Sequence, residues 1–171
     1  MGRTMSMDDQ EPAACCRASV RRELVPVVQA LEKGLRGRLV AVVLFGSRAR
    51  GDAREESDWD MLVIARDLPW RHIERYREIK SILPPIWRGR VSILAKTPDE
   101  FEAHLPVIYL EIALDGLILY DSEEFAGSRL ERLRCLIHAL DLRRVERGKE
   151  LVWQWGRFPG LGWSLAWEEA A

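Results

Sequence analysis

Two carboxylates, Asp58 and Asp60, lie two residues apart and directly precede the apolar run 61–65. Residues at this spacing share one face of a strand, so both side chains would project together. Neighbouring carboxylates repel each other unless a cation lies between them, and their hard oxygen atoms suit Mg²⁺. The sequence therefore predicts a magnesium site with Asp58 and Asp60 as its ligands.

A Gly-Ser pair follows the apolar, β-branched run 39–45, which has the length of a buried strand. A strand that ends at Gly46-Ser47 and opens a short helix leaves backbone N–H groups free to bind an anion. Gly46 would let a phosphate approach the backbone, and Ser47 would cap the helix and offer a hydroxyl. Taken alone, the pair also fits an ordinary strand-to-helix turn. Next to the paired carboxylates, we expect a phosphate site.

Two arginines in the same stretch, Arg48 and Arg50, are candidate phosphate ligands. Arginine forms charge-assisted, forked hydrogen bonds to phosphate oxygens. Exposure to solvent, or pairing with Asp52, Glu55 or Glu56, is an equally good interpretation of these two residues. Both interpretations stay open at the level of sequence.

The double motif GSRARGD followed by SDWDMLV resembles the minimal nucleotidyltransferases of the DNA polymerase beta-like nucleotidyltransferase superfamily. The resemblance covers roughly residues 20–121. It implies that Gly46 and Ser47 hold nucleotide phosphates, and that Asp58 and Asp60 are catalytic residues that bind Mg²⁺. It also implies a nucleoside triphosphate, with ATP as the first candidate, whose nucleotidyl group passes to a hydroxyl of a protein or small-molecule acceptor.

The third carboxylate that such proteins carry on the next strand is absent, because Ser92 occupies the aligned position within the strand expected at 90–95. Serine supplies neither charge nor a base. The alternative function is therefore a catalytically weakened nucleotide-binding or partner-binding module, similar to an antitoxin. Asp99 and Glu100 lie just downstream, but Thr97 and Glu100 have the spacing of a helix capping box, which we prefer to a ligand role.

Composition narrows the range of partners. The chain has 26 basic and 27 acidic residues, so no net field draws it to nucleic acid or to a membrane. Its three cysteines do not form a framework of spaced pairs, and no apolar run reaches the roughly 18 residues of a membrane span, so we expect a cytoplasmic protein. The resemblance implies a small helical HEPN-type protein as partner, with an aminoglycoside as the other candidate acceptor.

These motifs require elements that position them, and alternating strands and helices predict an α/β (α+β) fold with a small mixed β-sheet flanked by helices. We expect a flexible N-terminal lead-in at 1–17, a nucleotidyltransferase domain at 18–121, and a C-terminal helix with a Trp-rich tail at 122–171. The domain would begin with a helix at 18–37 that Pro26 kinks or divides.

The last segment would form one long helix over 122–155, followed by a tail that is rich in tryptophan. A helix of this length exceeds what a small core needs on one side, so part of it could pack on another subunit. For the tryptophans, packing within the chain and a homo-oligomer interface are equal alternatives. A structural or assembly protein is therefore a third hypothesis.

Overall fold

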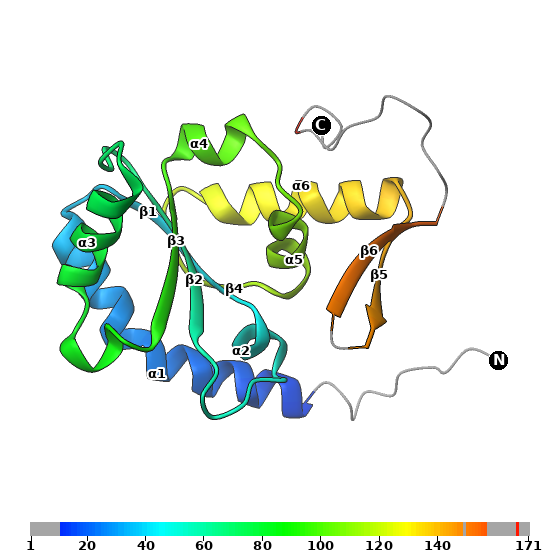
Figure 1. Cartoon of the computed structure of the whole chain (residues 1–171), viewed down its shortest axis with the longest axis horizontal. Coiled ribbons are helices and arrows are strands. Elements are labelled where there is room, and N and C mark those ends of the chain that lie inside the picture. Colours follow the sequence, from blue (N-terminus) through cyan, green and yellow to red (C-terminus); the bar gives the residue numbers. More distant parts are fainter. Residues whose placement is uncertain (1–10, 149, 157–166, 168–171) are drawn as a thin grey trace.

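A four-stranded mixed sheet forms the centre of the computed structural model, which describes residues 11–148, 150–156 and 167 (Figure 1). The strand order is β3-β2-β1-β4, with β1 antiparallel to both neighbours and β2 parallel to β3. The strands are β1 (Leu39–Phe45), β2 (Trp59–Ala65), β3 (Val91–Lys96) and β4 (Leu117–Asp121). The small mixed sheet predicted from the sequence is confirmed, and β1 has the predicted bounds.

Helices cover both faces of this sheet. Those of the first face are α1 (Glu11–Leu35) and α3 (His72–Ile82), and those of the second are α4 (Pro98–Ala103), α5 (Ile108–Asp115) and α6 (Phe125–Ala139). The β1 strand is apolar throughout because its residues alternate between the two resulting cores: Val42 and Leu44 face the first, and Ala41 and Val43 face the second. Helix α2 (Ser47–Arg50) and the 3-10 turn Pro85–Trp87 lie in the connections.

The first helix differs from the prediction at two places. It begins at Glu11, so part of the expected lead-in is helical, and residues 1–10 lie outside the described part of the chain. Pro26 lies inside a single continuous helix and does not divide it. Proline removes one helical hydrogen bond, but burial of Leu24, Val27 and Leu31 around it holds the helix against the sheet.

The predicted long helix over 122–155 is wrong. Helix α6 ends at Ala139, and the chain continues as an antiparallel hairpin of β5 (Leu142–Arg147) and β6 (Glu150–Trp155). Two positive φ angles separate these elements, +46° at Asp141 and +66° at Gly148, and a right-handed helix allows neither. The apolar residues of this segment fit a helical period, and only Leu151, Trp153 and Trp155 of β6 show the alternation of a strand.

The hairpin is held to helix α5 by a charged group. Arg144 on β5 donates to Glu111 and to both carboxylate oxygens of Asp115, and Trp153 on β6 donates to Glu111. These hydrogen bonds, led by those to Asp115, raise the pKa of Arg144. The hairpin therefore forms part of the domain instead of projecting as a separate arm.

Three of the four tryptophans at the C-terminal end pack within the chain. Trp153 and Trp155 contact the core of the second sheet face. Trp167 is buried, stacks obliquely on Phe101 and donates its indole N–H to the Phe101 carbonyl at 3.1 Å. Trp163 lies outside the described residues. Packing within the chain thus explains the described members of this group, and an oligomer interface stays a prediction.

Membrane insertion has no support among the helices that the structure describes. None of them combines the length and the hydropathy that a bilayer span requires.

Candidate functional site

The turn after β1 depends on Gly46. Its backbone has φ +73° and ψ −159°, a combination that only glycine adopts without strain. A Cβ atom at this position would lie 2.5 Å from the Oδ2 atom of Asp60, so any side chain would also collide with the carboxylate. Phe45 pairs with Asp60 across the two strands. The turn and the carboxylate therefore belong to one site.

Ser47 is the first residue of α2, and Gly46 is its N-cap. The prediction that Ser47 caps the helix is therefore wrong, because the helix starts one residue earlier than that role requires. Within the described chain, the Ser47 hydroxyl has no hydrogen-bond partner, and no acceptor contacts the backbone N–H of Ser47 or of Arg48. These donors at the turn are available to a ligand.

Trp59 decides which way the two carboxylates face. Its side chain is 3% exposed and packs edge-on against Trp87, with ring centroids 5.7 Å apart, in the core of the first sheet face. Successive side chains of a strand alternate between faces, so burial of Trp59 on the first sheet face directs Asp58 and Asp60 to the second. The predicted shared face of the two aspartates follows from this alternation.

Ser92 lies in the site, as its alignment predicts. It pairs with Asp60 in the parallel register of β2 and β3, and its hydroxyl donates to the Asp58 Oδ2 atom at 3.2 Å. The position of the expected third carboxylate is therefore next to the first two, and a neutral hydroxyl occupies it. The site carries two formal negative charges from these three residues.

The surroundings of Asp60 disfavour its negative charge. Burial raises the pKa of Asp60, the negative charge of Asp58 raises it further, and the positive charge of Arg50 partly offsets both. A carboxylate pair in this state gains from a nearby cation, because the cation removes the repulsion that raises the pKa.

The two arginines of the motif have different surroundings. Arg50 acts electrostatically on Asp60 and forms an ion pair with Asp52 at 3.2 Å. Arg48 instead donates to the backbone carbonyls of Glu55 and Ser57 and lies 4.4 Å from the centroid of the Trp59 ring. Arg48 therefore holds the loop between α2 and β2, which is a role that the sequence did not indicate.

Glu100 has no place among the candidate metal ligands. Thr97 and Glu100 form the predicted capping box at the start of α4. Both carboxylate oxygens of Glu100 also accept hydrogen bonds from Arg75, which is 2% exposed. The hydrogen bond from Arg75 is the main reason that the pKa of Glu100 falls to about 2. The role of Arg75 was missed, since one arginine in an amphipathic helix carries no signal of burial.

The donor set of the site fits Mg²⁺. Asp58, Asp60 and Ser92 offer only oxygen atoms, and Mg²⁺ commonly combines one or two carboxylates with water and phosphate oxygens. Across residues 11–148, 150–156 and 167, no group of three or more His, Cys, Asp or Glu side chains could hold a metal. The two aspartates would therefore share the ion with a bound nucleotide.

A hollow of about 450 Å³ adjoins the carboxylates on the outer side of β3. Asp58 and Ser92 form one end of its wall, and Tyr76, Lys80 and Arg88 line the other side. These three residues lie in and after α3, and sequence reasoning assigned none of them to the site. Their spacing in the sequence follows no motif, so only the packing of α3 beside β3 reveals them.

Comparisons with known proteins identify the family of this chain. The profile of the family described as Polymerase beta, Nucleotidyltransferase matches residues 29–125. A protein of Methanocaldococcus jannaschii, named as a candidate protein adenylyltransferase, is 34% identical over 116 residues, which are 66% of this chain and 79% of the relative.

Two solved structures have a looser likeness. A toxin-antitoxin structure with AMP-PNP has a TM-score of 0.47 and 20% identity, and the match covers 68% of this chain and 90% of the other. A candidate nucleotidyltransferase from Sulfolobus solfataricus has a TM-score of 0.46 and 20% identity, with 72% and 95% covered. Such low scores assign no function. The family profile spans more than half of the chain, and its match includes the Gly46 turn, both aspartates and Ser92. The chain therefore belongs to the Polymerase beta nucleotidyltransferase family.

Proposed function

We propose that this protein uses ATP and Mg²⁺ to transfer a nucleotidyl group to a hydroxyl of a protein acceptor. The observation that carries this proposal is the contact geometry at Gly46, where a turn with free donors lies directly against the Asp60 carboxylate. A triphosphate on the turn would thereby lie beside the paired aspartates. The candidate protein adenylyltransferase of M. jannaschii supports a protein as the acceptor.

The residues have distinct roles in this proposal. The Ser47 hydroxyl and the N–H groups of the turn donate to phosphate oxygens, and Arg50 adds positive charge. Asp58 and Asp60 would hold Mg²⁺, which would neutralise charge on the triphosphate. The acceptor hydroxyl loses its proton to water as its oxygen forms a bond to the α-phosphorus, the bond from that phosphorus to the bridging oxygen breaks, and pyrophosphate leaves. Positioning and electrostatics supply most of the rate enhancement.

Ser92 favours a second candidate function, a nucleotide-binding or partner-binding module with weak turnover. No carboxylate beside Asp60 on β3 is available to accept the proton of the attacking hydroxyl. The resemblance to minimal nucleotidyltransferases supports a HEPN-type partner in either case. An aminoglycoside acceptor would fit the same phosphate site, and transfer assays distinguish it from a protein.

The test combines binding with transfer. ATP labelled at its α-phosphate is incubated with Mg²⁺, this protein and either a HEPN-type protein encoded beside it or an aminoglycoside. We expect label on the protein acceptor, and its loss in Asp60→Asn. Asp99→Asn is the matched control, because Asp99 is an exposed aspartate at the start of α4.

The outcomes separate the two functions. Tight Mg²⁺-dependent ATP binding without transfer to any acceptor would favour the binding module. In that case Ser92→Asp should restore transfer, because it supplies the missing carboxylate beside Asp60. Equal ATP binding by the native protein and Asp60→Asn would contradict both functions.

A further inference from the structure

The outer edge of β3 carries backbone groups that no strand pairs. The Arg90 carbonyl accepts from the Trp59 N–H at 2.8 Å, so the even-numbered residues of β3 direct their backbone groups to β2. Alternation along a strand then turns the N–H and C=O groups of Val91, Ile93 and Ala95 outward. Because β3 is the last strand of the sheet among the described residues, no described strand neighbours this edge.

Side chains from α3 occupy only the two ends of this edge. Lys80 donates to the Val91 carbonyl, and Arg75 donates to the Ala95 carbonyl at 3.1 Å. Between them, no residue in the described ranges bonds the outward N–H or C=O of Ile93. The edge therefore presents more donors than acceptors, and it suits an occupant that brings carbonyl and carboxylate oxygens.

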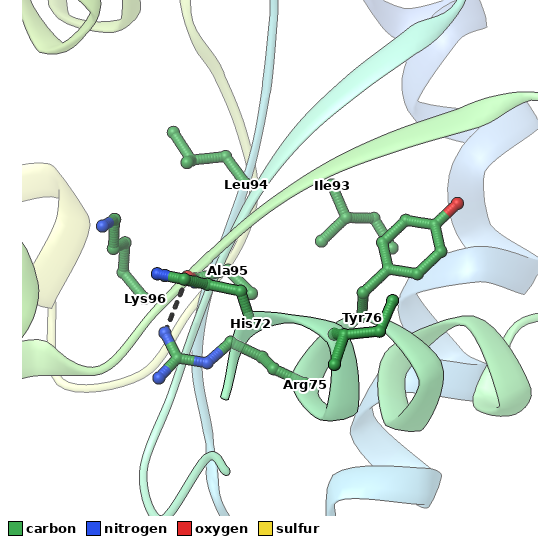
Figure 2. Close-up of a pocket in the computed structure, with 8 residues that line it drawn as sticks. His72, Arg75, Tyr76, Ile93, Leu94, Ala95 and Lys96 are labelled. Carbon is green, nitrogen blue, oxygen red and sulfur yellow. Dashed lines mark hydrogen bonds between the residues drawn. The ribbon is translucent and has the colours of Figure 1, made fainter. Parts of the chain in front are cut away.

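A groove runs along this edge and reaches the paired aspartates. Its first part is a hollow of about 430 Å³ that is lined by His72, Ile73 and Tyr76 of α3 and by β3 from Ile93 to Lys96. Figure 2 shows His72 and Tyr76 beside this part of β3. The hollow beside the aspartates, which Asp58 and Ser92 line, shares Tyr76, Ile93 and Leu94 with the first hollow. The two hollows therefore adjoin at Tyr76, Ile93 and Leu94, and the second extends to Asp58 of the candidate site. Together they form the groove.

Large apolar side chains are exposed on α3, where Ile73 and Tyr76 line the groove, and just before α3. Trp70, Ile73 and Tyr76 follow each other at intervals of three residues and are 89%, 54% and 47% exposed. Ile73 and Tyr76 lie three residues apart on one face of α3, and Trp70 lies just before this helix. Exposed aromatic and aliphatic groups beside a hollow are typical of surfaces that bind a protein partner.

The side chains that line the groove carry mainly positive charge. Lys80 and Arg88 bond only to backbone carbonyls, so no carboxylate within the described chain neutralises either cation. Lys96 adds a third positive charge, and among the described residues Asp58 of the candidate site is the one acidic residue that lines either hollow. Opposite charge steers and orients a partner. The groove therefore complements an acidic segment.

We propose that this groove binds an extended, acidic segment of the protein acceptor, which pairs with Ile93 as an added strand. Main-chain hydrogen bonds supply affinity in this mode, and alternate side chains supply specificity. The segment would place a hydroxyl residue beside Asp58 and Ser92, where the groove ends. The assignment of the segment to the acceptor rests on the proposed transfer function, whereas its binding does not.

A fluorescent seven-residue peptide of alternating glutamate and valine is the probe, and its binding is measured by polarisation without nucleotide. Two derivatives carry N-methyl groups, one on every valine and the other on every glutamate. Only one of these sets faces β3 in a strand pair, so we expect one derivative to bind at least tenfold more weakly and the other to bind within threefold. A peptide with lysine in place of glutamate should bind at least tenfold more weakly.

The matched protein variants are Ile73→Glu and Ile86→Glu, both at exposed isoleucines. Ile73 lines the groove and Ile86 does not, so only the first variant should weaken binding of the acidic peptide. Absent binding at millimolar peptide, equal binding of both methylated derivatives, or displacement by oligothymidylate would overturn the proposal. None of these results bears on nucleotidyl transfer, because the binding assay contains no nucleotide.

Discussion

Replacement of Gly46 by alanine is the most direct test of the close contact between the Gly46 turn and the Asp60 carboxylate. The φ of +73° at ψ −159° is strained for any L-residue, at a cost of about 1–3 kcal/mol. The new Cβ would also lie 2.5 Å from the Asp60 Oδ2 atom, so the carboxylate must move. We expect Gly46→Ala to lower the free energy of unfolding by about 3 kcal/mol, or Tm by about 6–12 °C for a domain of this size.

Gly51→Ala is the matched control for this change. Gly51 has φ +90° and lies at the other end of α2, and no atom lies within 4 Å of a Cβ built there. Gly51→Ala should lower the free energy of unfolding only by the cost of a left-handed backbone for alanine, about 1–2 kcal/mol. Urea denaturation measures both variants, and calorimetric titration with ATP and Mg²⁺ measures binding. Binding should be lost in Gly46→Ala and kept in Gly51→Ala. Equal destabilisation, or ATP binding within twofold of the native protein in Gly46→Ala, would refute the reasoning.

Three further predictions concern the packing around the site. Trp167→Ala should lower the free energy of unfolding, measured by urea denaturation, by about 3 kcal/mol because the indole is buried. Trp70→Ala, at an 89% exposed position, should change it by no more than about 0.5 kcal/mol. Similar losses in the two variants would contradict the packing of Trp167. Arg144→Ala should cost about 1–2 kcal/mol because it removes the cation that pairs with two carboxylates of α5, Glu111 and Asp115. Arg143→Ala, at an exposed ion pair with Asp141, should leave Tm unchanged. A larger loss in Arg143→Ala than in Arg144→Ala would contradict the anchoring role of Arg144. The lowered pKa of Glu100 means that its ion pair stabilises the fold above pH 4.5 and that this contribution disappears as the pH falls toward about 2. The Tm of Glu100→Gln should therefore fall less between pH 4.5 and about 2 than the Tm of the native protein. An equal fall in both proteins would mean that other groups cause the loss of stability in acid.

Local patterns predicted much of the central domain. The run 39–45 became β1, since seven consecutive apolar residues fit a strand that is buried on both faces. The capping box of Thr97 and Glu100 was also correct, because its hydrogen bonds join residues three apart and need no distant partner. The shared direction of Asp58 and Asp60 could also be predicted locally, because side chains alternate between the two faces along a strand.

The segment after α6 shows where such patterns fail. Its apolar residues satisfy a helical period, which predicted one helix, and Leu142 and Val145 of β5 do not alternate as strand residues would. The Arg144 contacts with Glu111 and Asp115 favour the hairpin, and they join residues that lie about 30 positions apart. Ser47 was misassigned for a smaller reason, because the position of a helix cap is uncertain by one or two residues.

The types and spacing of Gly46, Ser47, Asp58 and Asp60 were enough to indicate a nucleotide site and the family, because these residues lie close together in the chain. The pairing of the strands determined the neighbours of these residues. The parallel register of β2 and β3 places the Ser92 hydroxyl beside both aspartates, and the position of β3 at the edge of the sheet leaves Ile93 open to an added strand. Register and edge position depend on contacts between distant segments, which local periodicity does not encode.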